Sequence, residues 1–191
     1  KSCRKLRHLQ LPDTLKGIGY EAFANCESLM SVTIPNDVTT IGQGAFRMGA
    51  STSLESVALS TSLRSIGEQA FYQCRKLTTI AIPDTVTSIG VRAFARCSTL
   101  ASVSLPTSVV SVGNVAFEGC DKLSACSSSV TSNLDVNGKF VVPPSWRDIT
   151  AFTFAGCQVL KSIEIPTSIE TIQYAAFSQS GLVGDLQIPS S

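Results

Sequence analysis

Residues 74–97 read C-R-K-L-T-T-I-A-I-P-D-T-V-T-S-I-G-V-R-A-F-A-R-C and contain one complete structural unit. The run L-T-T-I-A-I has the two-residue period of a strand and is rich in β-branched residues. It ends at Pro83 because proline cannot donate to a strand ladder. The run V-T-S-I is again β-branched and is stopped by Gly90. The remaining A-F-A-R-C has room only for a helical turn. The stretch therefore predicts a strand, a corner, an extended return and a short turn.

The same unit repeats along the whole chain, and a phenylalanine marks each copy. The unit reads C-x2-L-x2-[VIL]-x-[IL]-P-x2-[VLI]-x2-I-G-x2-A-F, and successive copies are 23 residues apart except for two spacings of 25 and 37. The markers are Phe23, Phe46, Phe71, Phe94, Phe117, Phe154 and Phe177. The chain opens and closes inside a unit, so it holds eight strand positions and seven Ala-Phe positions.

A coil of about 23 residues cannot bury its own apolar side, whereas stacked coils share one continuous core. We therefore expect a single solenoid domain over residues 1–191, with roughly eight coils about 4.8 Å apart and a length of about 38 Å. The first and last units are incomplete and carry no polar cap. We expect the segment to be part of a longer array or to associate end to end.

These landmarks, such as Ala93, Phe94 and Cys97 or Leu105 and Pro106, resemble the leucine-rich repeat of the 23-residue bacterial surface-antigen (BspA-like) type. The resemblance covers residues 3–189. It implies an α/β fold, a right-handed solenoid with parallel strands on one face and with extended segments and short helical turns on the rest. It also implies a non-enzymatic role in binding other molecules and favours an extracellular or cell-surface location.

The largest departure from the repeat lies between Cys120 and Pro143. These two are 23 residues apart where Cys97 and Pro106 are 9 apart, which gives an insertion of 14 residues. The dipeptide at 137–138, Asn-Gly between two alternating apolar arms, is a strong hairpin signal. We expect a β-hairpin at about residues 127–142 that projects from one face, with Trp146 packed in the core beside it. The alternative is an insertion without function.

Composition excludes several classes of partner. Lys+Arg 15 against Asp+Glu 14 gives a net charge of +1, which lacks the basic excess needed to neutralise phosphates and argues against nucleic acid. No run approaches the ~18 apolar residues that cross a bilayer, so we expect no membrane insertion of this segment. One span is locally basic, which we interpret as ordinary solubility charge. Its cations are Arg64, Arg75, Lys76, Arg92 and Arg96, against Glu68 and Asp84.

The residue types that carry catalysis are sparse. The single histidine, His8, follows Arg7 and has no carboxylate to orient it, which argues against a Ser-His-Asp triad. Six of the seven cysteines share one inward position. Equivalent positions lie about 4.8 Å apart with parallel Cβ vectors, which fits a column of reduced thiols better than disulfides. Only for the pair Cys120 and Cys126 does the sequence leave a disulfide as an alternative. We therefore predict no enzyme, no catalytic residue, no cofactor and no metal site.

The outward residues of the strands are small and neutral, as in Ser31 and Thr33, so a protein contact centred on them would lack the usual aromatic and arginine anchors. We predict instead that a protein partner binds residues 129–141. The predicted site residues are Asp135, Asn137, Lys139, Ser102, Ser104 and Ser162. The function predicted is a non-enzymatic binding module. The alternatives are a spacer within a longer array and a flat Ser/Thr-rich face that binds glycan or ice.

Overall fold

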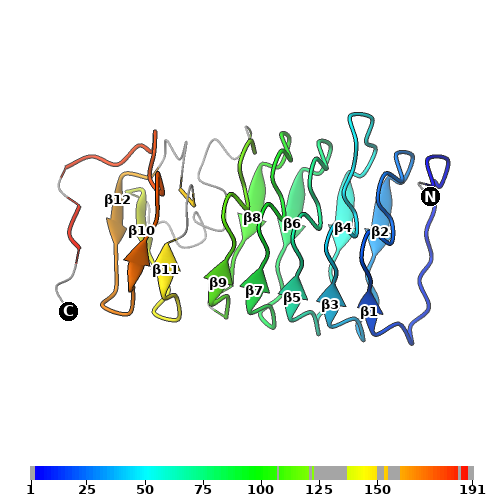
Figure 1. The fold of residues 1–191 in the computed structure, drawn as a ribbon, viewed down its shortest axis with the longest axis horizontal. Helices are drawn as coiled ribbons and strands as arrows, with labels where there is room; N and C mark the ends of the chain where they lie inside the picture. The colour runs from blue at the N-terminus through cyan, green and yellow to red at the C-terminus, as the bar shows by residue number, and fades with distance from the viewer. Residues whose placement is uncertain are drawn as a thin grey trace.

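The computed structural model describes residues 3–106, 108–120, 122, 137–149, 153–154, 160–184 and 186–188. They form an elongated stack of coils with short strands on two sides (Figure 1). The strand face consists of β2 (Ser31–Thr33), β4 (Ser56–Ala58), β6 (Thr79–Ala81), β8 (Ser102–Ser104), β10 (Lys139–Val141) and β12 (Ser162–Glu164). The return side consists of β1 (Gly17–Ile18), β3 (Thr40–Ile41), β5 (Ser65–Ile66), β7 (Ser88–Ile89), β9 (Ser111–Val112), β11 (Asp148–Ile149) and β13 (Thr171–Ile172).

Every strand pair in the described chain is parallel, and each pair joins neighbouring coils. The strand face contains the two-stranded ladders β2–β4, β6–β8 and β10–β12. The return side contains the five-stranded sheet β1-β3-β5-β7-β9 and the pair β11–β13. The expected parallel solenoid is therefore confirmed. The return segments, expected only to be extended, are strands as well.

The expected helical turns are not present: the described residues contain no helix, so the α/β assignment was wrong. The reason lies in the backbone around each repeat phenylalanine. Wherever it is described, the second residue before the phenylalanine has a positive φ, and the second residue after it does in all but one coil, as at Arg92 (54°) and Arg96 (62°). This left-handed conformation cannot continue a right-handed helix. It lets amides of the turn donate along the stack instead, as Gln73 does to the Ala95 carbonyl at 2.9 Å.

The number of coils is also smaller than expected. The solenoid has about six turns, with six strands on the strand face of the described chain, rather than roughly eight coils. Residues 6–11 and the described residues of 183–188 carry the apolar pattern of a strand but form none. Each lies at an end of the stack, where a strand has a neighbour on only one side.

The register continues across the insertion. Phe140 of β10 pairs with Ile163 of β12, 23 residues on, and it is buried at 1% exposure. The Ser145 hydroxyl donates to the Val109 carbonyl at 3.4 Å, as the Ser108 hydroxyl does to the carbonyl of Val86 one coil earlier. The coil after the insertion therefore stacks on the coil before it.

A stack of aromatic rings fills the centre of the solenoid. Phe46, Phe71 and Phe94 are fully buried, and consecutive rings lie 5.3–5.4 Å apart and within 4° of parallel. Beside the insertion the stack changes, because Trp146 takes a position held elsewhere by valine. Its ring centre is 6.4 Å from that of Phe154, and it is 3% exposed, as expected for a core residue.

Glycine follows each of the first five return strands and allows neighbouring coils to approach closely. A Cβ atom placed on Gly90 would lie 2.4 Å from the Glu68 nitrogen, and one on Gly113 would lie 2.3 Å from the Val91 nitrogen. Nothing lies within 4 Å of the corresponding position on Gly19, in the first coil. The repeated glycine therefore reflects contact between backbones of neighbouring coils.

Candidate partner-binding site

The β10–β12 ladder brings two of the predicted site residues together. Lys139 and Ser162 are directly paired across the two strands, and the chain enters β10 through the exposed Asn137 and through Gly138 at φ 78°. The Gly138 carbonyl accepts the Lys161 amide at 2.8 Å. Residues that the sequence assigned to a projecting hairpin thus lie, from Lys139 on, in a regular strand of the solenoid.

This placement concerns the second arm of the predicted hairpin. The predicted second arm of the hairpin includes Lys139–Val141, and the structure shows this arm as β10, paired in parallel within the repeat. The unit resumes its strand after the insertion, because Phe140 fills the apolar position. Residues 123–136 lie outside the described part of the chain. They include Asp135 and the predicted first arm, so the hairpin at 127–142 stays a prediction.

The side chains of this ladder form an ion pair. The Lys139 ammonium lies 2.6 Å from a Glu164 carboxylate oxygen, and both side chains are about half exposed. Val141, on the same side of β10 as Lys139, is 46% exposed. A salt bridge at this exposure contributes less than about 1 kcal/mol to folding, so its charges remain available to a partner.

The remaining predicted residues belong to another ladder. Ser102 and Ser104 are the ends of β8, which pairs with β6 so that Ser102 lies opposite Thr79 and Ser104 opposite Ala81. No ladder joins β8 to β10 in the described chain. The six predicted residues are therefore divided among the β6–β8 ladder, the β10–β12 ladder and the insertion.

A groove near the first coil was missed by the sequence analysis. It has a volume of about 350 Å³ and runs between residues 8–13 and β2, with His8, Asp13, Ser31 and Thr33 in its lining. It forms where residues 6–11 make no backbone hydrogen bonds to β2. The repeat pattern carries no signal for it, because these residues occupy ordinary outward positions.

The buried cysteines form a column inside the stack. Cys26, Cys74, Cys97 and Cys120 are buried thiols, as expected, whereas Cys3 is exposed. The Cys97 thiol donates to the Phe71 carbonyl at 3.1 Å, and the thiols at 74 and 120 do the same one coil away on either side. Burial raises the pKa of Cys97 well above its ordinary value. These four residues are structural; Cys126 and Cys157 lie outside the described residues.

The described part of the chain contains neither a metal-binding cluster nor a membrane-spanning helix. No cluster of three or more His, Cys, Asp or Glu side chains is arranged to hold a metal ion. No helix there is long and apolar enough to span a bilayer.

Comparisons with known proteins agree with the observed repeat. The family described as BspA type leucine-rich repeat region matches residues 1–124 and 129–191, in six copies. The leucine-rich repeat protein of T. pallidum is 28% identical with a TM-score of 0.68, and the match covers 85% of this chain and 71% of that one. A leucine-rich repeat protein from Bacteroides ovatus is 23% identical with a TM-score of 0.55, covering 96% and 61%. No curated protein sequence matches the chain significantly. The chain belongs to the BspA-type leucine-rich repeat family.

Proposed function

We propose that the chain is a non-enzymatic module that binds a protein partner outside the cell or at its surface. The family supports the binding role and the location, since repeats of this type are associated with surface proteins. The residues that we propose for this binding lie on the β10–β12 ladder. Among the described strands of the strand face, this ladder combines opposite charges with an exposed apolar side chain: Lys139, Glu164 and Val141.

The rest of the strand face offers weaker anchors. The outward residues of β4 and β6 are Ser56, Ala58, Thr79 and Ala81, all small and uncharged. Small side chains bury little area, and interface energy is concentrated in a few large or charged residues. The proposed site therefore comprises Lys139, Val141, Ser162 and Glu164, with Asn137 and Asp135 of the insertion and with Ser102 and Ser104 of the separate β6–β8 ladder.

The test compares two double variants of the same chain. Lys139→Ser with Val141→Ser gives β10 the small outward residues of the other coils, whereas Ser31→Ala with Ser56→Ala changes the β2–β4 ladder, which contains no residue of the site. We expect the first variant to capture at least ten-fold less of the partner that mass spectrometry identifies from the native source. The control should capture it fully. Equal capture by both variants would exclude the β10–β12 ladder.

The role of the insertion needs a separate variant. A deletion must stop at residue 136, because Lys139–Val141 is a ladder strand whose removal would damage the fold. Replacing residues 127–136 by a short Gly-Ser join should leave thermal melting unchanged and weaken capture. Unchanged capture would confine the site to the strands.

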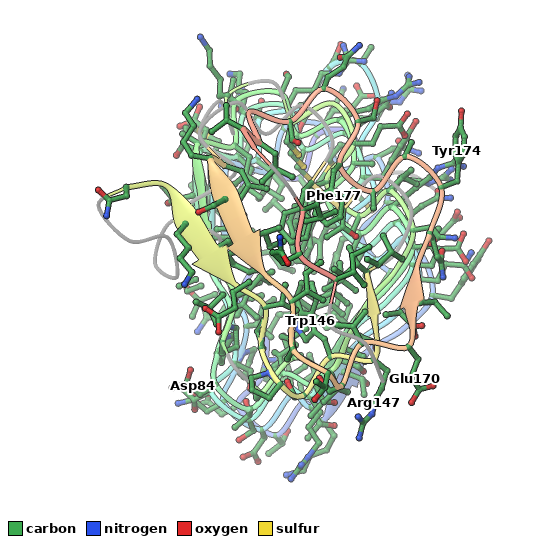
Figure 2. All side chains as sticks on the ribbon, turned by 90° about the vertical axis from the view of Figure 1, so that its left-hand side faces the viewer. Asp84, Trp146, Arg147, Glu170, Tyr174 and Phe177 are labelled. Carbon is green, nitrogen blue, oxygen red and sulfur yellow. The ribbon has the colours of Figure 1, made fainter. Side chains whose placement is uncertain are left out.

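A spacer that associates end to end is the second candidate, and the C-terminal end of the stack favours it. Figure 2 looks onto this end and shows Phe177 and Trp146 between the two strand columns, with Tyr174 pointing outward. Val183 and Ile188 are 69% and 63% exposed although they occupy apolar positions of the repeat. Light scattering tests this role: concentration-dependent association that Val183→Ser with Ile188→Ser abolishes supports it, and a monomer at all concentrations contradicts it.

A further inference from the structure

The turns around the repeat phenylalanines form a third side of the solenoid, and two neighbouring turns there are unusual. Tyr72 lies in register with Ala95, because the Gln73 amide donates to the Ala95 carbonyl at 2.9 Å. Arg92 and Arg96 flank Ala95 in the same turn, and both are exposed. Arg75, also exposed, follows the Tyr72 turn. Two consecutive coils thus contribute a half-buried tyrosine and three exposed arginines to neighbouring positions of this side.

Arg75, Arg92 and Arg96 make no ion pair among the described residues. By contrast, five other cations each pair with an acidic residue of a neighbouring coil. They are Arg4, Lys16, Arg47, Lys76 and Lys139. The charge of these turns is therefore open to an external anion.

The backbone gives no folding reason for arginine at two of these positions. Arg92 and Arg96 have φ values of 54° and 62°, and the equivalent positions hold glycine at Gly44 and Gly119. A side chain in this region is disfavoured by about 1–2 kcal/mol relative to glycine. Seven other non-glycine residues have the same conformation at equivalent positions, so the backbone there accepts a side chain without selecting arginine.

The stem of Arg96 passes close to the turn of the next coil. A Cβ atom on Gly119 would lie 3.4 Å from the Arg96 Cγ, which is an ordinary contact distance. The guanidinium lies beyond this stem on an exposed side chain.

We propose that Tyr72, Arg75, Arg92 and Arg96, the turn-side patch, bind an acidic segment of a protein. Arginine binds carboxylates in a bidentate manner, and tyrosine and arginine dominate the energetic centres of protein interfaces. A long polyanion is a poorer fit, because its affinity grows with the number of neutralised charges and this chain has a net charge of only +1. The patch is separate from the β10–β12 ladder and does not depend on it.

The experiment measures binding of a fluorescein-labelled Asp/Glu-rich peptide to the full chain by anisotropy at low ionic strength. Arg92→Gln with Arg96→Gln should weaken binding at least ten-fold. The matched control, Arg7→Gln with Arg64→Gln, removes the same charge from exposed positions elsewhere and should change affinity less than two-fold. Tyr72→Ala, with melting checked, should also weaken binding. Lys139→Ser with Val141→Ser should leave it unchanged, which separates this proposal from the strand-face site.

Three results would overturn the proposal. Equal losses of peptide affinity in the two double-arginine variants would show long-range electrostatic attraction without a specific site. If the unmodified chain did not bind the peptide, acidic protein segments would be excluded as ligands of the patch. A sulfated oligosaccharide that binds more tightly than the peptide, with the same dependence on Arg92 and Arg96, would assign the patch to anionic glycan instead.

Discussion

Individual residues in this fold are constrained mainly by the left-handed positions beside each phenylalanine. Val115 has a φ of 53°, a region that β-branched residues rarely occupy. Asparagine is more readily accommodated there, because its short polar side chain tolerates this conformation. The strain at Val115 is thus a local cost that the surrounding stack tolerates.

Replacing this residue should stabilise the protein. We expect Val115→Asn to raise the free energy of unfolding by about 0.5–1 kcal/mol, measured by urea denaturation. Val110→Asn is the control, since Val110 is 48% exposed and its φ is not positive. The control should change stability by less than about 0.5 kcal/mol. A destabilised Val115→Asn variant would show that packing of the valine outweighs backbone strain.

The raised pKa of Cys97 makes stability depend on alkaline pH. Burial disfavours the thiolate in the folded state, whereas the unfolded thiol ionises above about pH 8.5. The folded state binds the proton more tightly, so this contribution is fully present below the unfolded pKa and is lost as pH rises toward the folded pKa. We expect the free energy of unfolding to fall in this range by up to about 1.4 kcal/mol per pH unit for this thiol.

Cys97→Ala isolates that effect. The variant should be less stable overall, because it loses a buried side chain, but its decline with pH should be shallower. Urea unfolding at a series of pH values above 8 gives both slopes. Parallel slopes in the two proteins would mean that the thiol does not control the alkaline dependence.

At the level of elements, the coils of β3, β5, β7 and β9 each contact the preceding coil at the glycine corner. Gly90→Ala would place a Cβ atom 2.4 Å from the Glu68 nitrogen and should destabilise the protein by about 2–3 kcal/mol. Gly19→Ala has open space and should change stability by less than about 1 kcal/mol. The comparison of the two denaturation midpoints checks the prediction. Similar losses at both sites would point to backbone entropy rather than contact between coils.

The sequence predicted the parallel stacking of the strands correctly but not the conformation of the Ala-Phe turns. The Leu-x-x strands and the parallel stack followed from the repeat, since one coil cannot bury its own core. The Ala-Phe turn was mistaken for helix because its left-handed positions hold Gln, Arg and Val, which carry no signal for positive φ. The hairpin reading of Lys139–Val141 arose because Asn137 and Gly138 also suit the entry to a strand. The turn-side patch is visible only once Tyr72 and Arg96 are placed on adjacent coils.

The molecule as a whole has two blocks of return-side strands, and its stability should follow that division. The sheet β1-β3-β5-β7-β9 is continuous, whereas β11–β13 is a separate pair. Opening in stacked repeats is governed by nearest-neighbour contacts, and a block with fewer neighbours opens at lower free energy. Hydrogen exchange read by mass spectrometry should show slower exchange for Ile66 and Ile89 than for Ile172. Uniform protection along the stack would contradict this expectation.

The column of thiols has a consequence for biosynthesis. A chain made in an oxidising compartment exposes every cysteine before it folds, and mispaired disulfides formed then would block the stacking that buries Cys74 and Cys97. Folding and oxidation therefore compete. The contacts that hide each thiol join segments only 26–28 residues apart, so burial can proceed coil by coil without a long-range search. The refolding yield with and without a reductant would measure what fraction of the chain folds before its thiols are oxidised.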